Sequence, residues 1–116
     1  MGTEDGGTDE LPYTVKKREV VAETAELSVK VFTLAPGEQL PWHSHSAIDD
    51  IFFCLEGQVA VETRAPARTW LLRPGERCTV PARTEHLVTN ADAKTSRYLL
   101  VQGIGTYDFI PAGKTR

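Results

Sequence analysis

Three histidines, His43, His45 and His86, are the residues of this sequence best suited to metal chemistry. A single residue separates His43 from His45. On a β-strand, such a pair lies on one face with Cα atoms about 6.5–7 Å apart, whereas on a helix the two side chains point about 200° apart. If this segment is extended, both imidazoles can therefore bind one ion at about 2.0–2.1 Å per bond.

Two carboxylates follow this histidine pair. Asp49 and Asp50 stand directly before the apolar segment Ile51–Leu55. An acid that leads into such a segment is costly to bury unless a cation meets it. Histidines combined with a carboxylate suit divalent metals that accept imidazole, including iron, manganese, nickel and zinc. The pattern therefore indicates one divalent transition metal as the cofactor.

The segments that must position these residues are short and rich in β-branched residues. They recur at intervals of about 8–12 residues with Gly and Pro turns between them, which is typical of an all-β sandwich or barrel. The segment Leu27–Leu34 carries Leu27, Val29 and Val31 on one face, and a helical turn fits only Glu19–Leu27. Further expected strands are Ile51–Leu55, Gln58–Thr63, Thr69–Leu72, Arg77–Val80, His86–Thr89 and Arg97–Gln102.

Two linked motifs around the histidines resemble those of the cupin family. The first runs from Gly37 to Gly57 as G-x5-H-x-H-x4-D-x6-G, with Asp50 where the family usually has Glu. The second runs from Gly75 to Asn90 as G-x5-P-x-R-x2-H-x3-N, with Arg83 where the family has a second Gly. An H-x-H pair alone is a weak signal, but two motifs in the correct order and spacing are a strong one.

This resemblance implies an all-β, cupin-type jelly-roll β-barrel with one metal ion in its mouth, held by His43, His45, Asp50 and His86. Asp49 fits a shorter variant of the first motif and is the alternative carboxylate. Since Asp is about 1.5 Å shorter than Glu, either its strand sits closer or the acid reaches the metal through a water. At Arg83 the family glycine suits a positive φ, so we expect a turn of different shape there.

The resemblance implies a metal-dependent enzyme acting on a small organic substrate. Cupins include dioxygenases, and also isomerases, lyases and cyclases of sugar acids or polyketides. A non-catalytic ligand-binding or sensor cupin is the alternative, and a barrel in which the metal only staples the fold is a third reading. No catalytic residue is assigned beyond the ligands, and neither the substrate nor the metal can be identified from the sequence.

Several further residues are candidates for supporting this site. Cys54 and Phe52 share a strand face with Asp50, where we expect a small buried hydrophobe and a wall of the site. Nearer the C-terminus, Tyr98, Gln102 and Asp108 are candidates for contacting the ligands or for acid–base work. The sequence does not determine which face these three occupy.

Composition limits the organisation of the chain. Its 116 residues suffice for one compact domain, 13–116, preceded by a flexible acidic tail, 1–12. Thirteen basic and 16 acidic residues give a net charge of −3, which provides no strong field for nucleic acid or anionic lipid. We expect no membrane partner either, because no apolar run approaches the roughly 20 residues of a span.

Localisation and assembly follow from similar arguments. Two cysteines without an export signal are expected to be reduced thiols in a cytoplasmic protein. A small barrel has exposed sheet edges, and the stretch Tyr13–Val21 needs a partner to pack against. We therefore expect a homodimer in which this stretch packs against, or is swapped onto, the other subunit.

Overall fold

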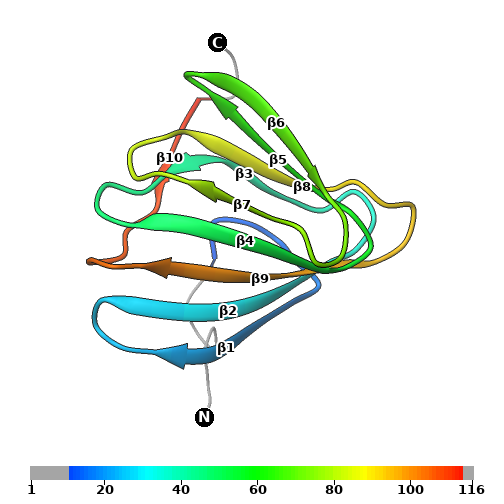
Figure 1. Cartoon of the computed structure of the whole chain (residues 1–116), viewed down its shortest axis with the longest axis horizontal. Coiled ribbons are helices and arrows are strands. Elements are labelled where there is room, and N and C mark those ends of the chain that lie inside the picture. The colour runs from blue at the N-terminus through cyan, green and yellow to red at the C-terminus, as the bar shows by residue number, and fades with distance from the viewer. Residues whose placement is uncertain (1–10, 114–116) are drawn as a thin grey trace.

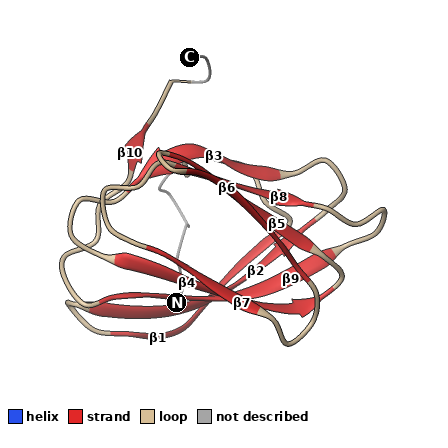
Figure 2. Cartoon of the chain, turned by 45° about the horizontal axis from the view of Figure 1, so that its top comes forward, coloured by secondary structure: helices blue, strands red, loops and turns tan. Residues whose placement is uncertain are grey.

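The computed structural model describes residues 11–113, so most of the expected acidic tail lies outside the described residues. The described part of the chain contains strands and connecting loops but no helix (Figures 1 and 2). Within the described residues, no helix is long and apolar enough to span a membrane. The strands are β1 (Lys17–Glu23), β2 (Leu27–Leu34), β3 (Gln39–Ser44), β4 (Asp49–Glu56), β5 (Val59–Arg64), β6 (Ala67–Leu72), β7 (Arg77–Val80), β8 (His86–Asn90), β9 (Ser96–Gly103) and β10 (Ile110–Pro111).

The strands form two antiparallel sheets that face each other. One has the order β1-β2-β9-β4-β7 and the other the order β10-β3-β8-β5-β6. From β2 to β5 the chain passes from one sheet to the other at each connection, as in a jelly roll (Figure 2). The predicted all-β jelly roll is confirmed. Strand pairing in the described residues stays within each sheet, so the fold is a two-layered sandwich rather than a continuously bonded barrel.

Glu19–Leu27 forms a β-hairpin, so the helical turn expected there was wrong. The segment supplies most of β1, which pairs antiparallel with β2. Thr24 closes the hairpin: its backbone N–H donates to the Leu27 carbonyl at 2.7 Å, and its hydroxyl accepts from the Leu27 N–H at 3.1 Å. The adjacent β-branched residues Val20 and Val21 favour extended backbone, and pairing with β2 outweighs the weak helical pattern.

The inward face of β2 is not the one that its aliphatic residues suggest. Leu27, Val29 and Val31 lie on the outer face, whereas Lys30 and Phe32 point between the sheets and are 4% and 3% exposed. Phe32 stacks on Tyr98 of β9, with ring centroids 5.2 Å apart and an interplanar angle of 8°. Because β2 has apolar residues on both faces, alternation alone does not determine which face is buried.

The turn before β8 contains Arg83, which stands where the family motif has a glycine. Arg83 adopts a φ of 64°, and its backbone N–H donates to the carbonyl of His45 at 2.7 Å. The chain therefore keeps the left-handed conformation that suits glycine, contrary to the expected change of turn shape. This bond ties the turn before β8 to the residue that follows β3.

Candidate metal centre

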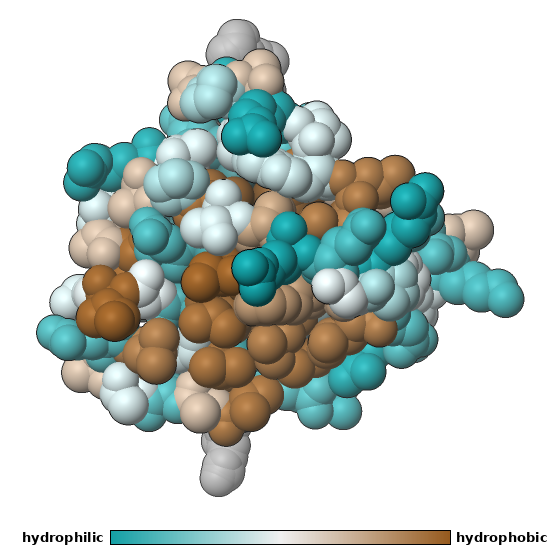
Figure 3. All heavy atoms as spheres, viewed as in Figure 1, coloured by the Kyte–Doolittle hydropathy of each residue, from teal (hydrophilic) through white to brown (hydrophobic). Residues whose placement is uncertain are grey.

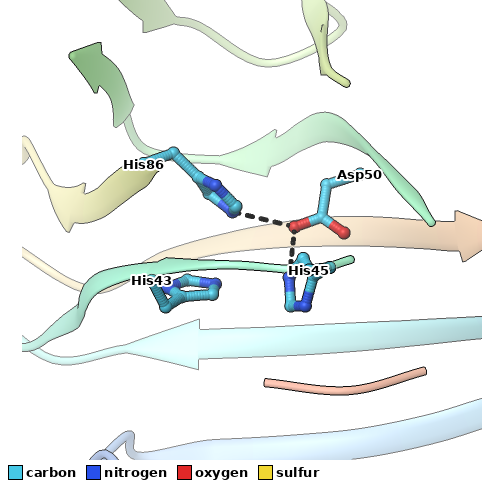
Figure 4. A group of neighbouring side chains, drawn as sticks. All are labelled: His43, His45, Asp50 and His86. Atoms are coloured by element: carbon cyan, nitrogen blue, oxygen red, sulfur yellow. Dashed lines mark hydrogen bonds and ion pairs between the residues drawn. The ribbon is translucent and has the colours of Figure 1, made fainter. Parts of the chain in front are cut away.

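Four side chains from both sheets converge at one point between the layers (Figure 4). His43 lies on β3 and His86 opposite it on β8, while His45 follows β3 directly. Asp50 projects from β4 of the facing sheet. All four residues are buried, and one ligand atom from each lies within 4.8 Å of the others.

Asp50 is the centre of this cluster. Its Oδ2 atom lies 3.1 Å from Nε2 of His45 and 3.0 Å from Nε2 of His86. Asp49 points elsewhere: it is exposed, and its Oδ1 atom accepts the backbone N–H of Ala82 at 2.9 Å. Of the two carboxylates considered from the sequence, the fold therefore brings Asp50 to the histidines and leaves Asp49 at the surface.

The outer ring nitrogen of each histidine is held by the backbone. A carbonyl oxygen can only accept, so each Nδ1 carries a proton, and in the neutral ring the lone pair is on Nε2. Histidines that bind metals commonly have this arrangement, because the bond fixes both tautomer and ring orientation. The three bonds run from His43 to Pro41 (2.6 Å), from His45 to Asp108 (2.5 Å) and from His86 to Thr84 (2.8 Å).

This arrangement requires a cation among the four groups. The Nε2 lone pairs of His45 and His86 face a carboxylate oxygen, so either protons or a metal ion must lie between these acceptors. Around an ion with bonds of about 2.0–2.2 Å, ligand atoms are at most about 4.4 Å apart. The observed limit of 4.8 Å is larger by only a few tenths of an ångström. The donor set thus fits a divalent metal with a small inward shift.

Burial and the neighbouring charges set the protonation of the cluster. Burial, reinforced by the nearby His86, lowers the pKa of His43 to about 3. Burial also disfavours charge on His45, but its hydrogen bond and charge interaction with Asp50 outweigh this and raise its pKa. Hydrogen bonds from His45 and His86 likewise outweigh burial at Asp50 and hold the pKa of that carboxyl well below its usual range.

Two of the three C-terminal candidates contact the ligands. Gln102 donates from Nε2 to Oδ1 of Asp50 at 3.0 Å, which leaves Oδ2 to the histidines. Asp108 accepts from His45 through its backbone carbonyl, and its carboxylate accepts from both the backbone N–H and the hydroxyl of Ser46. Tyr98 is fully buried in the core, and its hydroxyl makes no hydrogen bond within the described residues.

Three of the four candidate ligands, His43, His45 and Asp50, line a cavity between the sheets with a free volume of about 20 Å³, room for roughly one water molecule. Phe109 covers His43, with ring centroids 4.3 Å apart and an interplanar angle of 12°. Phe52 and Cys54, at 1% exposed each, are buried on the inner face of β4 as expected. Phe52 lines this cavity, whereas Cys54 packs in the apolar core.

Sequence reasoning missed Lys30, which also lines this cavity. Its Nζ atom donates to Oε1 of Gln102 at 2.8 Å. The signal was present but ambiguous: Lys30 alternates with Phe32 and Leu34, so the three share a strand face. A lysine in such a position is normally expected to face solvent.

Comparison with known proteins places this arrangement in a family. The chain matches the Cupin domain family over residues 30–102, which contain all four clustered residues. The chain belongs to the cupin family. No curated protein matches this cupin in sequence.

Solved structures share the fold. A conserved protein with a double-stranded β-helix domain from Klebsiella pneumoniae is 22% identical, with a TM-score of 0.72 and coverage of 84% of each chain. The protein TT1209 from Thermus thermophilus is 25% identical, with a TM-score of 0.71, covering 90% of this cupin and 98% of that chain. An oxalate oxidase in complex with glycolate is 17% identical, with a TM-score of 0.67, covering 74% of this cupin but 46% of that chain.

Proposed function

We propose that this cupin binds one divalent transition metal through His43, His45, Asp50 and His86 and acts with it as an enzyme on a small organic substrate. The observation that carries the proposal is the set of three Nδ1–carbonyl bonds, which leave three Nε2 lone pairs for the centre. Iron, manganese, nickel and zinc all accept such ligands. Burial of all four groups supports a site built for binding rather than a solvated surface cluster.

The proposed reaction is either an oxygenation or a non-redox isomerase, lyase or cyclase step. A bound ion supplies a Lewis acid, or dioxygen chemistry in the case of iron. The chain's own residues do the rest: Asp50 brings a negative charge to the site, Gln102 holds it in place, and Phe109 shields His43 from water. Four protein ligands leave room for substrate on an ion that takes five or six.

Elemental analysis of the purified protein tests the metal site. We expect close to one equivalent of a first-row divalent ion in the parent protein and its loss when His43 and His45 are both replaced by alanine. Asp49→Ala is the matched control, because it removes a neighbouring carboxylate outside the cluster and should keep the metal. Full occupancy in the double histidine variant would contradict the proposal.

Turnover with and without oxygen then separates the two reaction classes. A small-molecule panel of sugar acids, polyketides and aromatic acids is assayed with the metal-loaded protein in air and under argon. Oxygen uptake identifies an oxygenase, whereas turnover that persists under argon identifies a non-redox enzyme. If a panel member binds only to the metal-loaded protein and is not converted, the result favours a non-catalytic ligand-binding cupin over an enzyme.

We also propose that two copies of this cupin associate as a homodimer. Within the chain, the stretch from Tyr13 to Val21 already has partners: Tyr13 packs against Phe32 and Phe109, with ring centroids 6.0 and 5.8 Å apart. The strand β1, which begins within this stretch, pairs with β2 and has an open outer edge among the described strands. The contact between copies is thus better sought on another surface than this stretch.

A further inference from the structure

One stretch of chain crosses between the two sheets close to the candidate ligands. Residues 104–109, the crossing segment, leave β9 of one sheet and lead into β10 of the other, at the left of Figure 1. In the view of Figure 3, hydrophobic residues are packed closely across the face of the sheet β1-β2-β9-β4-β7, and no opening crosses it. The end of the sandwich where the crossing segment lies is therefore a better route to the ligands than this sheet face.

Two aromatic side chains of the crossing segment point inward. The ring of Phe109 stacks on His43, and the ring of Tyr107 lies against His45 with centroids 5.5 Å apart. The Nζ atom of Lys30 lies 4.5 Å from the centroid of the Tyr107 ring, a cation–π contact that favours the inward position of the ring. Tyr107 is nevertheless 45% exposed, so it lies at the boundary between the ligands and the solvent.

A second cavity adjoins the cavity of the ligands at Tyr107. This outer chamber has a free volume of about 80 Å³, and its lining includes Thr24 and Ser28 of the β1–β2 hairpin. Tyr107, Lys30 and Gln102 line both the outer chamber and the inner chamber, which is the cavity of about 20 Å³ at the ligands. Lys30 and Gln102 are fixed in the paired strands β2 and β9, whereas Tyr107 lies outside the strands. The ring of Tyr107 is thus the part of the shared wall best able to move.

The crossing segment is tied down near its two ends. Near its start, the backbone N–H of Gly105 donates to the carbonyl of Glu26 at 2.9 Å. Near its end, the carboxylate of Asp108 accepts from the backbone N–H of Ser46 at 2.8 Å and also from the Ser46 hydroxyl. Between these anchors, Tyr107 forms no backbone–backbone hydrogen bond with another described residue. Local opening costs least where few such bonds must break, so the middle of the segment is the part that opens most readily.

The size of the inner chamber shows why such an opening matters. With Tyr107 in place, this chamber has room for roughly one water molecule, which is too little for an organic substrate. Moving the Tyr107 ring away would join the inner chamber to the larger outer one. An enzyme that acts at these ligands therefore needs a moving part in this wall.

We propose that Tyr107 is the gate of the inner chamber, and that a small organic substrate enters through the outer chamber when the ring moves away from the ligands. The inference rests on the proposed metal site and adds the route to it. A gate raises the barrier to entry and to exit by the same amount. Its removal therefore speeds both processes and leaves the affinity of the site for its metal unchanged.

Removal of bound Co²⁺ by a chelator tests the gate. Pyridine-2,6-dicarboxylate is too large for the closed inner chamber, so it reaches the ion only after opening. In Tyr107→Leu we expect Co²⁺ loss, followed by stopped-flow absorbance, to be at least about tenfold faster than in the parent at the same chelator concentration. The equilibrium affinity for Co²⁺ should stay close to the parental value, because the bond that orients His45 comes from the backbone of Asp108 and is kept.

Three further variants separate a gate from a general loosening of the segment. Phe109→Leu removes a ring from the same segment, but Phe109 lines only the inner of the two chambers, so the rate of Co²⁺ loss should stay close to that of the parent. Tyr107→Phe keeps the ring and should also keep the parental rate. Ser46→Ala leaves Tyr107 intact and removes one hydrogen bond to Asp108, so it should speed Co²⁺ loss about two- to tenfold.

The outcomes separate this inference from the metal proposal. Failure of the parent to bind Co²⁺ would overturn the metal site, on which the gate depends. If Tyr107→Leu binds Co²⁺ as the parent does and loses it at the parental rate, Tyr107 is not the gate. Faster loss in Phe109→Leu than in Tyr107→Leu would overturn the route through the outer chamber. If Tyr107→Leu weakens Co²⁺ binding in proportion to its faster loss, Tyr107 supports the ligands and is not a gate.

Discussion

His45 and Asp50 form a buried pair in which Nε2 lies 3.1 Å from Oδ2, while Nδ1 of the same ring donates to the carbonyl of Asp108. With both ring nitrogens in hydrogen bonds to acceptors, the metal-free imidazole must carry a second proton. The proximity of Asp50 raises the pKa of His45 accordingly. A metal ion that binds here takes the place of that proton.

The first prediction is that metal binding releases a proton and weakens as the pH falls. His45 has a raised pKa, so its proton is held to a pH above the usual value of about 6.5 and competes with the ion below that point. His43, with a pKa of about 3, stays neutral and does not compete. Zinc titration calorimetry at pH 6 and pH 8, in two buffers of different ionisation enthalpy, measures both effects. Equal zinc affinity at pH 6 and pH 8 would contradict this prediction.

The same shift affects the metal-free fold in the opposite direction. Because the folded pKa of His45 exceeds its unfolded value, the pair with Asp50 contributes its full stability below the unfolded pKa and loses it as the pH rises through the folded one. Urea unfolding of protein kept in chelator measures this contribution. His45→Asn should remove this loss, so that the free energy of unfolding changes less as the pH rises. An unchanged pH dependence in His45→Asn would exclude His45 as its source.

The second prediction concerns the carboxylate. Asp50→Ala should weaken metal affinity by more than the roughly 10–100-fold that follows from losing a group that only supports a ligand. Asp49→Ala is the control and should change the metal affinity little, because the Asp49 side chain is exposed and accepts only the backbone N–H of Ala82. Equal effects of the two substitutions, measured by competition with a chelator, would remove Asp50 from the ligand set.

Lengthening the same side chain gives a third prediction. Oδ2 of Asp50 already lies 3.0–3.1 Å from two imidazoles, so the short acid reaches the cluster without an intervening water. Asp50→Glu should therefore keep the metal but crowd the space left for substrate, lowering turnover. Tighter metal binding in Asp50→Glu would instead indicate that the parent acid acts through a water.

The fourth prediction concerns Gln102, which fixes the orientation of Asp50. Gln102→Leu removes the donor to Oδ1 and should lower metal affinity by about 10–100-fold. Gln102→Glu keeps the size but replaces that donor by an acceptor, so it should be no better than leucine at neutral pH. A Gln102→Leu protein with parental affinity would show that Asp50 needs no such support.

The clustering of the four side chains can be expected from the sequence, because the motif residues are local to the turns that position them. Gly37 and Gly75 adopt φ values of +84° and +91°, which set the turns before β3 and β7. On β4, alternation with Phe52 and Cys54 turns Asp50 inward.

On β3, a register irregularity between Leu40 and His43 lets both of these residues point inward although they are three positions apart. His43 and Asp50 then face each other from the two sheets, and His86 of the second motif pairs with His43 on the neighbouring strand β8.

The contacts behind the ligands could not be predicted in the same way. Gln102 meets Lys30 and Ser28 only after β2 pairs with β9, across more than seventy residues of chain. Since β2 has apolar side chains on both faces, its pattern favours neither. The stacking of Phe32 on Tyr98 in the core favours the face of β2 that carries Phe32, and Lys30 is buried because it shares that face.

The last prediction concerns the turn before β8, where Arg83 has a φ of 64°. A residue with a Cβ atom pays roughly 1–2 kcal/mol for this left-handed conformation, whereas glycine adopts it freely. Arg83→Gly should therefore raise the free energy of unfolding by about 1 kcal/mol, less whatever glycine gains in the unfolded chain. The bond from its N–H to His45 is a backbone bond and survives the change. Urea unfolding measures the difference, with Gly75→Ala, at a φ of 91°, as the converse variant that should destabilise. A loss of stability in Arg83→Gly would mean that the arginine side chain contributes more than the strain it imposes.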